Sequence, residues 1–113
     1  MSPVHFAARG HPRNLEYLLS LGVSPYVKGA MGWSPLYYAA QFNCVDNCKI
    51  LVRYGWVDEP SDFGNTPLMI ACELGAFDVI DLLVEEGASL DLVNSIGKNC
   101  LVYIATSRRD RKD

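Results

Sequence analysis

The sequence predicts an all-α solenoid of about three and a half stacked helix–turn–helix units, with a hairpin-like loop projecting between units. Three markers that share one period support this prediction, and the period is about 33 residues, as in stacked-repeat proteins. A hydroxyl–proline pair recurs at a constant spacing, at Ser2-Pro3, Ser34-Pro35 and Thr66-Pro67. Two sets of glycines recur at nearly the same spacing, namely Gly32, Gly64 and Gly97, and Gly22, Gly55 and Gly87.

Each unit is expected to begin with a short first helix. The Ser or Thr suits the N-cap, where its side-chain oxygen accepts a hydrogen bond from a backbone amide that has no partner inside the helix. The proline that follows suits the first helical position, where no N–H is needed. In the second unit Leu36, Ala39 and Ala40 share one helical face, and the small alanines leave room for another helix. The segments that show this pattern are SPVHFAARG, SPLYYAAQF and TPLMIACEL.

A leucine-rich segment follows each first helix and is expected to form a second helix that ends at a glycine in a left-handed C-cap. These segments are RNLEYLLSLG, VDNCKILVRYG and FDVIDLLVEEG, and a turn-rich loop leads from each to the next unit. The last unit has only a first helix, GKNCLVYIA, with Asn99 and Cys100 in place of the hydroxyl and the proline. The predicted repeats are 1–31, 32–63, 64–96 and a partial 97–107, followed by a disordered tail at 108–113.

Length and charge narrow the class of protein. The chain has 113 residues, half of them hydrophobic and 20% charged, which is typical of one small folded domain. Its net charge of −3 argues against a nucleic-acid partner. No apolar run approaches the roughly 18 residues that a membrane-spanning helix needs, so we expect no membrane insertion. The ending SRRDRKD mixes both charge signs and is interpreted as a solvated terminus.

The four cysteines predict free thiols in a reducing compartment, the cytoplasm or the nucleus. Cys44 and Cys48 would lie on one face of a helix, which is half of a zinc site. No C-x2-C pair and no H-x3–5-H pair completes it, and His5 and His11 have structural uses. We therefore expect no metal and no other cofactor.

The sequence shows no catalytic pattern and predicts that the chain is not an enzyme. The serines before prolines are helix caps, and the sequence has no G-x-S-x-G turn, phosphate-binding loop or H-E-x-x-H helix. The acidic pairs Asp58-Glu59 and Glu85-Glu86 are adjacent in sequence, so their side chains point apart on a regular element.

The units resemble ankyrin repeats, whose signature is T-P-L-H-x-A-A followed by a V-V-x-x-L-L-x-x-G-A helix. The first part matches residues 2–8, 34–40 and 66–72, and the second matches VIDLLVEEGA at 79–88. The resemblance implies that His5 ties neighbouring loops together by hydrogen bonds. Trp56 departs from the pattern, because a small alanine is usual there. The stretch LLSLGVSPYVKGAMGWSPLYYAA also resembles, faintly, the corresponding stretch of Shank-type scaffold proteins.

The resemblance also implies that a partner protein binds a concave groove formed by the loops and the outward side of the first helices. Several residues at the family's variable positions are apolar and would neighbour one another across repeats, as at interaction sites. Trp33 is expected to be a central contact. Alternatively, some of these residues cover missing repeats or fold onto the loop beneath. The predicted partner-binding residues are Met31, Trp33, Gln41, Phe42, Asp62, Phe63, Asn65, Glu73, Leu74, Ile96 and Lys98.

The leading functional prediction is a non-catalytic scaffold or adaptor module for protein–protein interaction. One alternative is a regulatory ankyrin segment of a larger enzyme, channel or ubiquitin-ligase adaptor. Another is a structural spacer whose groove binds nothing. Neither end unit has the polar face of a capping repeat, so the chain is interpreted as a minimal ankyrin protein or a piece of a longer array, with end-to-end self-association as a further option.

Overall fold

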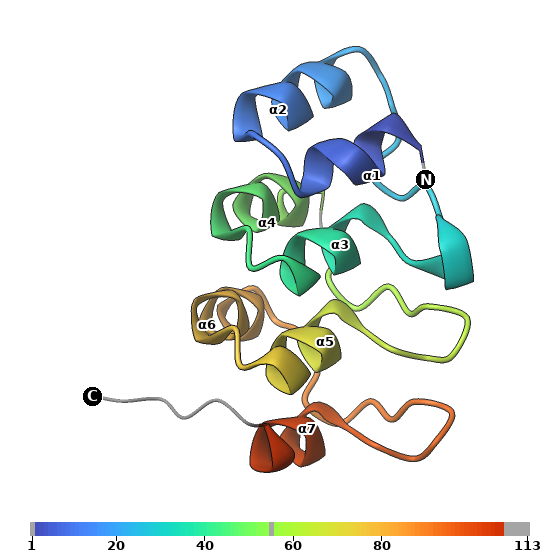
Figure 1. Cartoon of the computed structure of the whole chain (residues 1–113), viewed down its shortest axis with the longest axis vertical. Helices are drawn as coiled ribbons and strands as arrows, with labels where there is room; N and C mark the ends of the chain where they lie inside the picture. The colour runs from blue at the N-terminus through green and yellow to red at the C-terminus, as the bar shows by residue number, and fades with distance from the viewer. Residues whose placement is uncertain (1, 55, 108–113) are drawn as a thin grey trace.

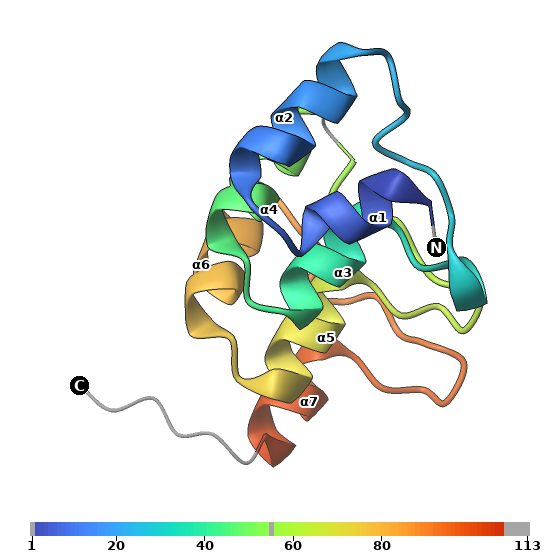
Figure 2. The same ribbon diagram turned by 45° about the horizontal axis from the view of Figure 1, so that its top comes forward.

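The computed structural model describes residues 2–54 and 56–107, and within them the chain forms α-helices and one short 3₁₀ helix, with no β-strand. Figures 1 and 2 show two layers of helices, with α1, α3, α5 and α7 stacked in one layer and α2, α4 and α6 in the other. Loops project from the side of the first layer. This is the predicted all-α solenoid. The elements are α1 (Pro3–Ala8), α2 (Pro12–Ser20), η1 (Ala30–Gly32), α3 (Pro35–Gln41), α4 (Val45–Val52), α5 (Pro67–Leu74), α6 (Phe77–Glu85) and α7 (Cys100–Thr106).

The first helices begin at the predicted caps. The Ser34 hydroxyl accepts a hydrogen bond from the Tyr37 amide at 3.1 Å. Helix α5, the next in that layer, begins at Pro67 after its Thr66 cap. Asn99 serves the same purpose for α7, because its side-chain oxygen accepts from the Val102 amide at 3.0 Å. An Asn therefore replaces the hydroxyl cap, as the sequence predicts.

Two second helices end as predicted. Gly22 and Gly87 both have φ +91°, a left-handed conformation that favours glycine. The Gly87 amide donates to the Val84 carbonyl and the Ala88 amide donates to the Leu83 carbonyl, which satisfies the last carbonyls of α6. The third predicted C-cap glycine, Gly55, and the predicted tail at 108–113 lie outside the described residues.

The core lies between the two layers. Ala39, Ala40 and Ala71 are fully buried on the first helices, where their small size lets α4 and α6 approach. Larger side chains fill the remaining space from both layers. Those that are fully buried include Val4, Leu15, Leu68, Val79 and Leu83.

Each loop has a tight hairpin-like tip, and adjacent tips are bonded to each other. The Gly29 amide donates to the Trp33 carbonyl at 2.8 Å, and the equivalent bonds close the next two loops. Between loops, the Asp62 amide donates to the Met31 carbonyl at 2.9 Å, and the Ser95 amide donates to the Phe63 carbonyl at 2.9 Å. Backbone hydrogen bonds therefore hold the three tips in one row, on the right of Figure 1.

His5 ties α1 to the loop between α2 and α3, because both carbonyls that it bonds lie in that one loop, whereas the resemblance implies a tie between neighbouring loops. Its ring is fully buried, and Nε2 donates to the carbonyls of Val27 at 2.6 Å and Trp33 at 3.1 Å. Nδ1 accepts from the Ser2 amide at 3.1 Å, so the ring carries its proton on Nε2. Burial is the main reason that the pKa of His5 is lowered, and the ring is neutral at pH 7.

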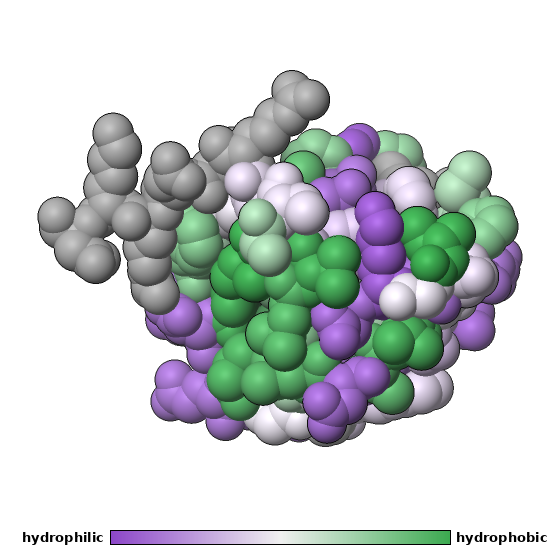
Figure 3. All heavy atoms as spheres, turned by 90° about the horizontal axis from the view of Figure 1, so that it is seen from below, coloured by the Kyte–Doolittle hydropathy of each residue, from purple (hydrophilic) through white to green (hydrophobic). Residues whose placement is uncertain are grey.

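The C-terminal end of the stack exposes side chains that are buried elsewhere. Leu101 and Ile104 on α7 are 53% and 37% exposed. Their counterparts in the preceding repeat, Leu68 and Ala71, have no exposed surface. Figure 3 views the molecule from this end and shows apolar residues gathered on it. The difference arises because α6 covers α5, whereas no described helix covers α7 in the same way.

Backbone amide exchange should therefore vary along the stack. We expect the amides of α3 and α5 to exchange slowest, because each of these helices packs against neighbours on both sides, and those of α1 and α7 to exchange fastest. Hydrogen–deuterium exchange followed by mass spectrometry measures this. Equal protection from end to end would contradict the expectation and would indicate that self-association covers the open ends.

Candidate partner-binding surface

Three of the predicted partner-binding residues form an exposed row along the loop tips. Met31, Phe63 and Ile96 are 56%, 51% and 68% exposed. Their loops are neighbours, because the backbone hydrogen bonds between tips join the Met31 carbonyl to one side of the Phe63 loop and the Phe63 carbonyl to the Ile96 loop. We call these three residues the tip row.

Two further apolar residues lie at the opposite ends of the first helices. Phe42 is the C-cap of α3 and Leu74 is the last residue of α5, and both are exposed. A helix of seven residues such as α3 is about 10 Å long at 1.5 Å per residue, so these residues lie well away from the tip row. The apolar residues expected to form one patch therefore lie in two rows.

Trp33 is less exposed than expected. Its ring stacks on Tyr37 with the centroids 5.0 Å apart and the planes at 21°, and it meets the edge of Tyr38 at 5.5 Å. It packs partly buried against the core, and its carbonyl accepts hydrogen bonds from His5 and Gly29. Trp33 thus supports the surface from behind the tip row.

The polar residues of the predicted partner-binding set differ in their exposure and in their hydrogen bonding. Asp62, Glu73 and Lys98 are exposed, whereas Gln41 and Asn65 are half-buried. The Asn65 side-chain oxygen accepts a hydrogen bond from the buried Asn94 amide group at 2.8 Å. Asn94 also accepts from the Lys98 backbone amide at 2.9 Å, so Asn65 belongs to a network that fixes the last loop.

Tyr37 lies buried between the two rows. Burial raises the pKa of its hydroxyl to about 12, and the negative charge of Glu73 adds to this effect. The hydroxyl is therefore protonated at physiological pH. Glu73 itself is exposed at the end of α5, beside Leu74, where a partner can reach it.

Sequence reasoning missed Arg9, the C-cap of α1, and Phe6, whose ring the Arg9 guanidinium contacts. Both are exposed, and the Arg9 side chain contacts Phe42 on α3. The signal was present, because Arg9 stands one repeat before Gln41, which the sequence placed in the site. Extending the variable positions back by one period would have found it.

The cysteines are all free thiols, and three of them are buried. Burial raises the pKa of Cys48 and of Cys72 to about 12, so these thiols are neutral at physiological pH. Cys44, which forms the predicted half of a zinc site together with Cys48, is partly exposed. Within residues 2–54 and 56–107, no group of three or more His, Cys, Asp or Glu side chains is placed to hold a metal ion.

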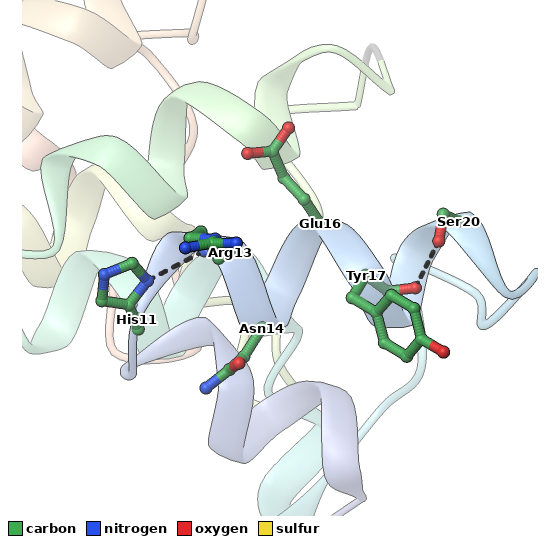
Figure 4. A pocket seen from close by; sticks show the side chains of 6 residues that line it. All are labelled: His11, Arg13, Asn14, Glu16, Tyr17 and Ser20. Atoms are coloured by element: carbon green, nitrogen blue, oxygen red, sulfur yellow. Dashed lines mark hydrogen bonds between the residues drawn. The ribbon is translucent and has the colours of Figure 1, made fainter.

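A hollow on the outer face of α2 is lined by His11, Arg13, Asn14, Glu16, Tyr17 and Ser20. Figure 4 shows Glu16 on one side of the helix and Asn14 and Tyr17 on the other. The hydrogen bonds drawn there are local, from the Arg13 amide to the His11 ring and from the Ser20 hydroxyl to the Tyr17 carbonyl. Because the side chains diverge, they do not converge on a reacting group as an active site requires.

Two family descriptions match the chain. "Ankyrin repeats (3 copies)" matches residues 1–59, and "Ankyrin repeat" matches residues 63–95. None of the helices in the described ranges has the length and hydropathy needed to cross a membrane.

The chain is also similar to segments of longer proteins. It is 36% identical over 101 residues to the Ankyrin repeat and SOCS box protein 11 of Mus musculus, covering 88% of this chain and 31% of that protein. It is 33% identical over 92 residues to the human Transient receptor potential cation channel subfamily A member 1, covering 77% of this chain and 8% of the channel. It is 34% identical over 85 residues to the Glycerophosphocholine phosphodiesterase gde1 of Schizosaccharomyces pombe, covering 74% of this chain and 8% of that protein.

Proposed function

The chain belongs to the ankyrin-repeat family, and we propose that it is a non-catalytic scaffold or adaptor module that binds a partner protein through the surface formed by its loop tips and first helices. Ankyrin repeats are protein-interaction modules, in which stacked units present one extended binding surface. The observation that carries the proposal is the tip row, where three large apolar side chains face solvent on consecutive repeats.

The tip row has two properties of a binding site. Exposed apolar side chains that gather on one surface of a soluble protein usually mark an interaction site. The backbone hydrogen bonds between tips fix the relative positions of the loops that carry these side chains before binding, which lowers the entropy lost when a partner docks. Met31 and Phe63 are therefore the residues that we expect to contribute most.

The relatives support an interaction role for this segment. They do not indicate one kind of parent protein, because they are proteins of three different kinds. Their names describe a SOCS box protein, a cation channel and a phosphodiesterase, and the chain spans a third or less of each. A regulatory segment of a larger enzyme, channel or ubiquitin-ligase adaptor is the second candidate. The free thiols support placement in the cytoplasm or the nucleus. The gene's complete reading frame tests the second candidate directly.

Replacing Phe63 tests the proposal, with Tyr54 as a matched control. Both are exposed aromatic residues, but Tyr54 lies after α4, away from the loop tips. A photocrosslinking residue at position 63 or at position 54 would identify the partner in cells. Calorimetric titration with the purified partner should then show that Phe63→Ala weakens binding by roughly 2 kcal/mol and Tyr54→Ala by less than about 0.5 kcal/mol. Equal crosslinking at both positions, or unchanged binding by Phe63→Ala, would refute the proposal.

Trp33→Ala should behave differently from Phe63→Ala. We expect it to lower the free energy of unfolding by about 1–3 kcal/mol, because it removes two aromatic contacts and part of the core packing. Phe63→Ala should change that free energy by less than about 0.5 kcal/mol, since the ring is half exposed and projects from a loop tip. Thermal melting of the two variants checks this. If Trp33→Ala melts at the same temperature as the unmodified protein, the Trp33 ring contributes to partner contact alone and not to the stability of the fold.

End-to-end self-association is a further candidate interaction, favoured by the exposed apolar residues of α7. The amide-exchange experiment described above tests it, together with sedimentation equilibrium over a range of protein concentrations. A molecular mass that stays at that of one chain at every concentration would exclude it.

A further inference from the structure

The Arg9 side chain lies between two exposed aromatic rings. Its guanidinium carbon is 5.3 Å from the centroid of the Phe6 ring on the same helix and 5.1 Å from that of Phe42 on α3. The ion pair that the structure shows within residues 2–54 and 56–107 joins Arg53 to Glu16 at 3.7 Å. In that part of the chain, the Arg9 guanidinium forms no ion pair and no hydrogen bond.

This arrangement leaves the strongest binding groups of Arg9 free. A cation–π contact depends on the charge of the guanidinium and uses none of its N–H groups to donate a hydrogen bond. Those N–H groups match the two oxygens of a carboxylate, with which Arg forms bidentate hydrogen bonds. The two rings also restrict the side chain, so less conformational entropy is lost when a carboxylate binds.

The residues equivalent to Arg9 change charge from one repeat to the next. In three consecutive repeats the position holds Arg9, Gln41 and Glu73, which are positive, neutral and negative. The following position holds Phe42 and Leu74, both exposed and apolar. The three first helices are packed neighbours in the stack (Figure 2), and packed helices lie about 8–10 Å apart. The positive and negative ends are therefore separated by roughly 20 Å.

The position of Glu73 argues that its charge serves binding more than folding. It lies in the last turn of α5, where the helix dipole favours a cation and disfavours a carboxylate. Arg9, at the C-cap of α1, has the favourable sign, so its charge alone would not indicate a partner. A site that holds opposite charges at its two ends, with Phe42 in the repeat between them and Leu74 beside Glu73, matches a segment with the opposite order of charges.

We propose that the helix-end strip binds a linear segment of a partner protein that places a carboxylate on Arg9, apolar side chains on Phe42 and Leu74, and a basic side chain on Glu73. The helix-end strip consists of Arg9, Gln41, Phe42, Glu73 and Leu74. This inference rests on the proposed interaction function and specifies the chemistry and direction of the partner. About six residues of extended chain, or about thirteen of a helix, span the strip.

A random peptide library displayed on phage tests the inference. Peptides selected on the full chain should carry an acidic and a basic residue on opposite sides of an apolar centre. For synthetic versions of these peptides, Arg9→Gln and Glu73→Gln should each weaken binding roughly tenfold. The matched controls, Arg13→Gln and Glu85→Gln, neutralise exposed charges outside the strip and should leave the affinity unchanged.

Exchanging the two charges gives a sharper result. The double variant Arg9→Glu with Glu73→Arg should reject the selected peptides and bind versions whose acidic and basic residues are interchanged, with an affinity within about tenfold of the original. Peptides that lose affinity with Phe63→Ala but ignore both charge changes would overturn this inference and leave the proposed function standing. Failure to select any peptide, or equal binding by the exchanged variant, also overturns it.

Discussion

Replacing Leu68 with alanine is expected to lower the free energy of unfolding by about 2–5 kcal/mol. Leu68 is completely buried in α5, which packs against α3, α6 and α7. Its removal leaves a cavity between the two layers that the surrounding helices fill only in part. Because neighbouring repeats stabilise each other through their interfaces, the loss should extend to the whole stack.

Leu101→Ala is the matched control for Leu68→Ala. It removes the same side chain from the same position of the next repeat, but Leu101 is 53% exposed. We expect it to cost less than about 1 kcal/mol, since the methyl groups that it removes are already in contact with water. Urea denaturation followed by circular dichroism measures both variants. Equal shifts of the two midpoints would show that α7 is covered in solution.

Replacing His5 with alanine is expected to cost about 2–4 kcal/mol, because the variant removes the hydrogen bonds from Nε2 to the carbonyls of Val27 and Trp33 and leaves polar groups without their partner. His5→Gln keeps an N–H donor and should recover part of the loss. The exposed His11 is the control, because its ring accepts one hydrogen bond at the start of α2, and His11→Ala should cost no more than about 1 kcal/mol. Urea denaturation of the three variants measures these differences.

The contribution of His5 should also depend on pH. Its pKa is lowered in the folded chain, so the unfolded chain binds a proton at a higher pH than the folded chain does. The stabilisation is therefore complete above about pH 6.5, the value for an unfolded His, and is lost as the pH falls below it. Urea midpoints measured between about pH 8 and pH 5 should show this loss. A His5→Ala variant that keeps the full pH dependence would assign it to other groups.

The architecture could be predicted from the sequence because its signals are local and repeated. A cap residue before a proline fixes the start of a helix, and a glycine with left-handed backbone angles fixes its end. The structure has Ser34, Thr66 and Asn99 at N-caps and Gly22 and Gly87 at the ends of second helices. The period of about 33 residues between these markers then predicted that the units stack, without knowledge of any contact between residues.

The surface was harder to predict because side-chain direction in a loop follows no period. Trp33 precedes a helix cap, like an exposed loop residue, yet its ring turns onto Tyr37 and Tyr38. The period could have placed Arg9, which stands one repeat before Gln41, but not its contact with Phe42, which joins residues in different repeats. Residues such as these are placed by packing between segments, which the order of residues in one segment does not show.

The hydrogen bonds between loop tips set the spacing of the tips independently of the side chains that the tips carry. Met31 and Phe63 contribute backbone carbonyls to these bonds, and their side chains take no part in them. A substitution that the backbone tolerates therefore keeps the bond that sets the distance to the next tip; at Met31, where φ is +58°, proline is excluded and β-branched residues are strained. Gly32, next to Met31, lacks this freedom, because its φ is +73° and a Cβ there would lie 2.9 Å from the backbone nitrogen of Asp62. Mutations at these positions can therefore change which partner the tips recognise. The spacing of the loops, which the backbone hydrogen bonds set, stays the same.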